Sequence, residues 1–121
     1  MKTLLITLFL ILSISAISQD KVLLEYAEDI EIYASREFEQ SMKGPEGELY
    51  LFGQENLIEG EYTFKVSIGL KNKVTSVFVK ERNGGDISMQ NILKDAVMEF
   101  KFKTFKVPKG KYYNVIYTFK F

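Results

Sequence analysis

The fold is decided by the stretch Gly60-Glu61-Tyr62-Thr63-Phe64-Lys65-Val66-Ser67-Ile68-Gly69-Leu70, in which every second residue from Tyr62 onward is apolar. Polar or small residues occupy the positions between them. A period of two over this length is typical of a β-strand with one buried and one exposed face. We therefore predict a strand here, with its aromatic face in the core.

Two more strands are predicted further along the chain. The polar turn at 71–73 leads into residues 74–80, which are rich in β-branched and aromatic residues, so the first two strands form a hairpin. The last strand covers 112–121 and also alternates. Its inward face carries Tyr113, Val115, Tyr117, Phe119 and Phe121, and its outward face carries Tyr112, Asn114, Ile116, Thr118 and Lys120.

One helix is predicted between the hairpin and the last strand. Apolar residues recur at helical spacing over 88–100, after the chain-breaking residues 83–85, and Ser88 is a suitable N-cap. The order strand-strand-helix-strand predicts an α+β fold. It is a β-β-α-β module in which a three-stranded antiparallel sheet packs on one helix.

An acidic segment, residues 19–56, precedes this module. The apolar residues Leu23, Ala27, Ile30, Ala34 and Phe38 fit one helical face, although residues 29–33 also alternate like a strand. We predict that this segment is helical. Residues 48–52 have the pattern of a short strand before the module, which begins at residue 57.

The composition excludes several classes of function. The 121 residues include no His, no Cys and no Trp. Disulfides are therefore impossible, and most catalytic bases, thiol nucleophiles and transition-metal ligand sets are missing. We expect no enzyme activity, no catalytic residue, no metal and no cofactor.

The formal net charge of zero hides an asymmetry along the chain. Residues 19–61 carry twelve acidic and three basic side chains, whereas residues 62–121 carry twelve basic and four acidic ones. One interpretation is that the two halves attract each other within one domain. The other is that the basic half binds an acidic partner and that the acidic segment covers this surface when the partner is absent.

The first eighteen residues have the layout of a secretory signal. Lys2 supplies the positive start, residues 4–17 form an apolar run without charge, and Ala16-Ile17-Ser18 offers small residues for cleavage after Ser18. This predicts export to a bacterial periplasm, because small cysteine-free domains are unusual in the animal secretory pathway. The alternative is an uncleaved anchor, residues 4–17, in the inner membrane. The predicted organisation is therefore a signal peptide (1–18), the acidic segment (19–56) and the β-β-α-β domain (57–121).

Residues 57–121 resemble the TonB C-terminal-like domain family. The resemblance rests on the glycine before the first strand (Gly60), the passage Phe105-Lys106-Val107-Pro108-Lys109-Gly110 and the closing aromatic strand Tyr117-Thr118-Phe119-Lys120-Phe121. The passage is also similar to the related AgmX/PglI-type motility domain, whose helix usually holds a cysteine. The sequence contains no histidine, which the membrane anchor of a full energy transducer of this family carries, and no Pro-rich spacer.

This resemblance implies a periplasmic interaction domain that binds a short extended peptide beside its last strand. The partner would be a peptide of an outer-membrane transporter or another envelope protein. The partner-binding residues implied are Tyr112, Asn114, Ile116, Thr118 and Lys120. Such pairing is physically reasonable, since an unpaired strand edge offers a row of N–H and C=O groups.

A cluster of five lysines follows the predicted helix, interleaved with aromatic residues: Lys101, Lys103, Lys106, Lys109 and Lys111. Such a basic surface can bind nucleic acid or glycan. The simpler interpretation places the aromatics inside and the lysines in solvent. We expect no nucleic acid partner, because an exported protein rarely meets one, and no small-molecule substrate.

A second functional hypothesis is a self-associating structural protein of the envelope. The same exposed strand edge and the charge asymmetry could drive formation of a homodimer.

Overall fold

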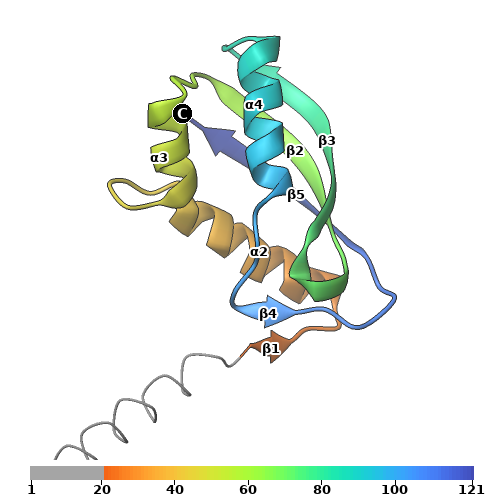
Figure 1. Ribbon diagram of the computed structural model, residues 1–121. Helices are drawn as coiled ribbons and strands as arrows, with labels where there is room; N and C mark the ends of the chain where they lie inside the picture. Colours follow the sequence, from red (N-terminus) through yellow and green to blue (C-terminus); the bar gives the residue numbers. More distant parts are fainter. Residues whose placement is uncertain (1–20) are drawn as a thin grey trace, which may run out of the picture.

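The computed structural model describes residues 21–121 and has a mixed α+β fold, as predicted (Figure 1). Its main sheet is three-stranded and antiparallel. The elements in chain order are β1 (Val22–Leu23), α2 (Ala27–Ser41), α3 (Glu48–Glu55), β2 (Glu61–Ile68), the 3₁₀ turn η1 (Leu70–Asn72), β3 (Val74–Asn83), α4 (Ile87–Met98), β4 (Phe105–Lys106) and β5 (Tyr113–Lys120). The predicted signal peptide, residues 1–18, lies outside the described residues.

The strand order of the sheet is β3-β2-β5, so the first strand of the module is central. β2 pairs with β3 through the short η1 connection, where Lys71 and Asn72 both have positive φ values, 62° and 58°. β5 returns on the other side of β2, with Tyr62 opposite Phe119 and continuous pairing along its length. Both β3 and β5 are therefore edge strands among the described elements.

One face of the sheet forms the core. The alternate residues Tyr62, Phe64, Val66 and Ile68 of β2 are all fully buried, as the period-two pattern predicts. Helices α2 and α4 cover this face. Phe38 of α2 lies within 5.3 Å, between ring centroids, of four aromatic rings: Phe100, Phe102, Tyr117 and Phe119.

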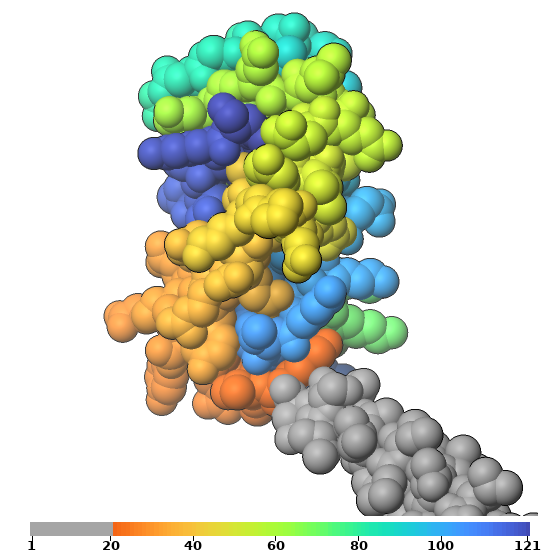
Figure 2. Space-filling model, turned by 90° about the vertical axis from the view of Figure 1, so that its left-hand side faces the viewer, coloured from red at the N-terminus to blue at the C-terminus, as the bar shows by residue number. Residues whose placement is uncertain are grey.

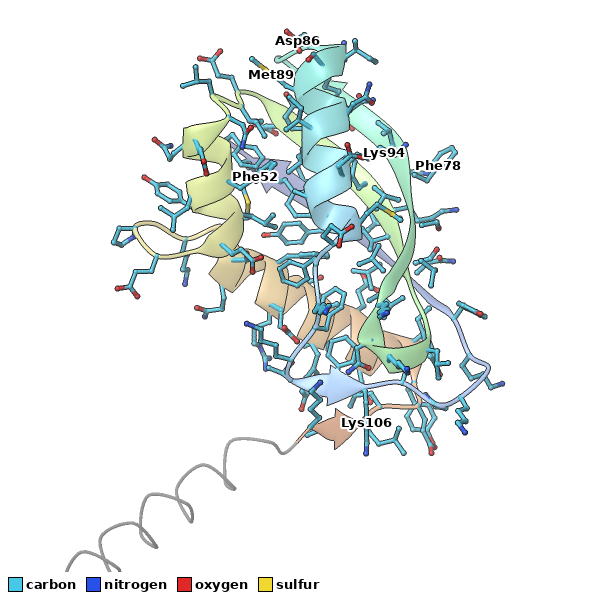
Figure 3. The ribbon with its side chains drawn as sticks, viewed as in Figure 1. Phe52, Phe78, Asp86, Met89, Lys94 and Lys106 are labelled. Carbon is cyan, nitrogen blue, oxygen red and sulfur yellow. The ribbon has the colours of Figure 1, made fainter. Side chains whose placement is uncertain are left out.

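No helix or strand within residues 21–121 covers the opposite face of the sheet. Phe78 of β3 is 61% exposed, and its side chain points away from α4 (Figure 3). Lys65 of the central strand β2 is opposite Phe78 of β3 and opposite Ile116 of β5. Its Nζ is 5.4 Å from the Phe78 ring centroid. An antiparallel sheet of this kind can expose one face to water.

The helix α4 begins one residue earlier than predicted and has a different N-cap. Asp86, not Ser88, is the N-cap, and its carboxylate accepts a hydrogen bond from the backbone N–H of Met89 (2.8 Å). Gly84 and Gly85 both have positive φ, so the chain has already turned before Asp86. Asp86 and Met89 lie together at the start of α4 in Figure 3.

The prediction of a short strand at residues 48–52 was wrong, because this segment belongs to α3. Leu49 and Gly53 are buried one helical turn apart, and this spacing prevails over the local alternation. The hydroxyl of Ser41 accepts a hydrogen bond from the Leu49 N–H at 3.0 Å and so satisfies a donor at the start of the helix. Gly53 packs against the ring of Phe121, which leaves no room for a Cβ at this position.

The acidic segment shares the hydrophobic core of the sheet. Ile30, Ala34, Phe38 and Leu49 belong to the same cluster of buried side chains as the strands. The short parallel pair of β1 with β4 was not predicted, and it joins Val22 to Phe105. None of the helices within residues 21–121 is long and apolar enough to span a membrane.

Candidate functional site at the free edge of the last strand

The backbone of β5 presents half of its hydrogen-bonding groups outward. The Phe121 N–H donates to the Gly60 carbonyl (3.0 Å), and this bond shows which alternate residues of β5 exchange backbone hydrogen bonds with β2. In an antiparallel pair, alternate residues bond to the neighbouring strand and those between them point away from it. The outward-pointing backbone groups are therefore those of Asn114, Ile116, Thr118 and Lys120.

Side-chain contacts between β2 and β5 support this assignment of the outward-pointing residues. The hydroxyls of Thr63 and Thr118 are 2.8 Å apart, and Ser67 donates to Asn114 Oδ1 at 2.6 Å. Side chains approach most closely in the pairs that do not exchange backbone bonds. Among residues 21–121, no hydrogen bond from another element reaches the outward backbone groups of β5. A row of unpaired donors and acceptors remains available for a further strand.

The other edge of the sheet is much less regular. The register of β3 against β2 shifts twice, so that Thr75 and Lys80 have no opposite partner. Such bulges bend an edge strand and disrupt pairing with a further strand. All eight residues of β5 instead pair in one register with β2. β5 is therefore the better template for an added strand.

The structure brings four of the five predicted partner-binding residues together on β5, where their backbone groups line the free edge: Asn114, Ile116, Thr118 and Lys120. Asn114, Ile116 and Lys120 are exposed, and the Ile116 side chain retains 51% of its accessible surface. Tyr112 lies just before the strand and is 68% exposed. Its ring covers Gly69, where an added Cβ would be 2.6 Å from the ring.

The inner side of β5 is covered by α2, which runs in the same direction. The Tyr113 hydroxyl donates to the Glu25 carbonyl (2.9 Å) near the start of both elements. Near their ends, the rings of Phe38 and Tyr117 are 5.3 Å apart. Burial raises the pKa of Tyr117, and the negative charge of Glu39 raises it further. Figure 2 shows α2 (orange) between the end of β5 (dark blue) and the segment that precedes β4 (light blue).

The five predicted basic residues do not form one patch on one element. Lys101 and Lys103 border a hollow beside α2, Lys106 lies on β4 (Figure 3), and Lys109 and Lys111 lie in the connection to β5. All five are exposed, whereas the interleaved aromatics Phe102 and Phe105 are 1% and 0% exposed. Phe102 and Phe105 are thus inside and the lysines in solvent, whereas Tyr112, which follows Lys111, is exposed.

The hollow has a volume of about 530 Å³ and lies between α2 and residues 100–104. It places Arg36, Lys101 and Lys103 near three glutamates, Glu37, Glu46 and Glu48. Glu37 is already engaged, because its carboxylate accepts hydrogen bonds from the N–H groups of Lys103 and Thr104 and from the Thr104 hydroxyl. Sequence reasoning missed this hollow, because its walls come from segments that are far apart in the chain.

Searches against protein-family models, curated proteins and solved structures find no match to this chain. Within residues 21–121, no group of three or more acidic side chains is close enough to hold a metal ion. The geometry of the described residues gives two candidate sites, the free edge of β5 and the hollow beside α2.

Proposed function

We propose that the protein is a non-enzymatic interaction module of TonB C-terminal type, which binds an extended partner peptide by strand addition at β5. The observation that carries this proposal is the regular free edge of β5. Within residues 21–121, the outward backbone groups of four alternate residues there are unpaired, and no bulge interrupts the pairing of β5 with β2. The added strand would extend the sheet order to β3-β2-β5-partner.

The energetic gain from strand addition would be modest. A backbone hydrogen bond contributes about 0.5–1.5 kcal/mol net, and several would form along the outward groups of β5. The exposed side chain of Ile116 adds apolar contact with the partner. The resulting complex would be a weak or transient one, as expected for an adaptor.

We place this function in the periplasm, where the partner would be an outer-membrane transporter or another envelope protein. The support is the predicted signal sequence at residues 1–18 together with the resemblance of residues 57–121 to the TonB C-terminal-like family. The intact mass of the exported protein would separate cleavage after Ser18 from retention of residues 4–17 as an anchor.

The test of strand addition is the substitution Ile116→Pro. The Ile116 N–H points outward, so proline removes an edge donor without removing a bond of the ladder with β2. A display library of random peptides about ten residues long is first selected on the wild-type protein. The recovered peptides are then synthesised, and their affinities for wild type, Ile116→Pro and the control Ile116→Ala are measured.

We expect binding to be lost in Ile116→Pro and largely retained in Ile116→Ala, which keeps the N–H. Amide exchange should also slow on binding at Asn114, Ile116 and Thr118. Recovery of no peptide, or equal binding by the proline variant, contradicts the proposal. Circular dichroism of both variants checks that the sheet is intact.

Self-association at the same edge is the alternative function. Sedimentation at low and high salt distinguishes it, because a dimer formed through β5 would disappear in Ile116→Pro. A wild-type protein that stays monomeric at high concentration removes this alternative.

A further inference from the structure

We infer that the peptide accepted by the free edge of β5 carries Lys or Arg at alternate positions, on the side that faces α2. The inference rests on the proposed function and names the chemical class of its partner. The basis of the inference is the charge of the α2 side chains that lie beside the free edge of β5.

One side of α2 faces away from the free edge. Glu37 binds the backbone at Lys103 and Thr104, and the Tyr33 ring meets the edge of Phe105 with centroids 6.2 Å apart. This side of α2 therefore faces residues 103–105.

The segment that contains these residues continues toward the hairpin of β2 and β3. The Val107 N–H donates to Asn72 Oδ1 (3.2 Å), and the backbone of Lys101 forms an isolated antiparallel β-bridge with that of Lys73. Residues 101–107 thus lie on the side of α2 toward η1 and β3. The opposite side of α2 faces outward, beyond β5.

That opposite side is acidic. Successive residues of a helix are rotated by about 100°, so Glu39 lies almost opposite Glu37. By the same period, the side of Glu39 is shared by Glu28, Glu31, Ser35 and the half-exposed Ile32. The three glutamates are exposed, and Glu39 is close enough to β5 to raise the pKa of Tyr117, after the larger effect of burial.

No base on α2 offsets these charges. The one basic residue of the helix is Arg36, whose guanidinium lies 5.6 Å from the ring centroid of Tyr33, on the other side. A strand added at β5 would therefore run along the acidic side of α2, whereas Lys120, the base of β5 itself, shares the opposite face of the strand with Ile116. Lys or Arg at the positions facing α2 complements its acidic side.

The spacing of the acids suits an extended peptide. The helix rises about 1.5 Å per residue, so Glu28 and Glu39 are about 16 Å apart along α2. Alternate residues of a strand are about 6.6 Å apart, so three of them span about 13 Å. Three flexible basic side chains of the guest strand can thus reach the three glutamates.

The intervening positions of the guest face the open side of the sheet. There they meet Ile116, flanked by Asn114 and Thr118, whose side chains are already hydrogen-bonded to β2. A β-branched residue suits this surface better than a charged one. The partner segment therefore alternates between basic and β-branched residues.

A second copy of the chain fits this site poorly. Antiparallel pairing of two β5 strands would bring the acidic sides of two α2 helices together, and like charges repel. The β3 edge of another copy is interrupted by two bulges. The charge distribution therefore favours a basic segment of a different protein.

The test uses three end-blocked synthetic peptides of the pattern Thr-X-Val-X-Val-X-Thr, in which X is Lys, Gln or Glu. We expect the Lys peptide to bind about tenfold more tightly than the Gln peptide at low ionic strength, as three exposed ion pairs would give. The Glu peptide should bind most weakly. The preference should shrink in about 1 M salt, where screening acts within about 3 Å.

Two triple variants isolate the role of α2. Glu28→Gln/Glu31→Gln/Glu39→Gln should abolish the preference for Lys over Gln. The control Glu81→Gln/Asp95→Asn/Glu99→Gln changes the net charge equally, at acids on β3, on α4 and at the end of α4, and should keep it.

Equal affinity of the Lys and Gln peptides overturns the inference and leaves strand addition intact. Equal loss of preference in both triple variants also overturns it, because net charge alone would then explain the effect. Failure of all three peptides to bind overturns it as well. The proposed function is then decided by the library peptides and Ile116→Pro.

Discussion

Truncating Phe38 tests whether the acidic segment and the sheet form one cooperative unit. Phe38 is fully buried and touches four aromatic rings, which come from the segment after α4 and from β5. Replacing a buried Phe by Ala typically costs about 3–5 kcal/mol, through lost transfer energy and the cavity left behind. A domain of this size is stable by about 5–15 kcal/mol, so Phe38→Ala should remove a large share of its stability.

The matched control is Phe78→Ala on the open face of the sheet. Phe78 is 61% exposed, and its specific contact is the ammonium of Lys65. Its loss should therefore cost about 0.5–1 kcal/mol. Should Phe38→Ala leave too little folded protein to measure, Phe38→Leu serves as a milder variant, with an expected cost of about 1.5 kcal/mol.

The assay is urea unfolding followed by far-ultraviolet circular dichroism and tyrosine fluorescence. With a slope of about 1–3 kcal/mol per molar urea, Phe38→Leu should lower the midpoint by roughly 0.5–1.5 M at unchanged slope. Both probes should report one transition. The reasoning is refuted if Phe38→Leu and Phe38→Ala cost no more than Phe78→Ala, or if helix and sheet signals unfold separately.

Three further predictions concern single groups. Asp86→Ala should cost about 1 kcal/mol by loss of the helix N-cap, whereas Ser88→Ala should cost under about 0.5 kcal/mol; equal thermal shifts would contradict the assignment. Asn72→Ala should lower the free energy of unfolding in urea by about 1–3 kcal/mol, because the buried Val107 N–H loses its acceptor. Asn72→Gly suits the positive φ of this position but also lacks the acceptor, so the stability lost with this hydrogen bond should not return. The pKa of Tyr117 is raised by burial, so the folded protein holds this proton more tightly than the unfolded chain. The contribution of Tyr117 to stability should be constant below about pH 10 and fall above it, so that stability falls less steeply in Tyr117→Phe; equal slopes would contradict this.

The elements that could be predicted from sequence are those with a long, unbroken period. The alternation from Tyr62 to Ile68 predicted both the position of β2 and its buried face. The alternation over 113–121 did the same for β5, so this pattern alone places Asn114, Ile116 and Thr118 on the face opposite to the buried one.

Short segments were less predictable, because local patterns are ambiguous over a few residues. Residues 48–52 alternate, yet they fold as the start of α3, because burying Leu49 and Gly53 together requires helical spacing. The N-cap of α4 was misplaced by two residues, since both Asp86 and Ser88 are good capping residues. The two-residue pairing of β1 with β4 joins Val22 to Phe105 and leaves no local signal at all.

The sequence by itself determined the three strands of the main sheet, their buried face, helix α4 and the opposite charges of the two halves, because periodicity and charge are properties of neighbouring residues. Only the tertiary structure decided which strand is an edge, since the order β3-β2-β5 depends on contacts between distant segments. It also decided where the acidic side of α2 lies. The sequence left two interpretations of its charge asymmetry open: attraction between the two halves within one domain, or an acidic partner for the basic half. The packing of α2 along β5 places the acidic side of α2 toward the free edge, and this is why we propose a basic partner instead.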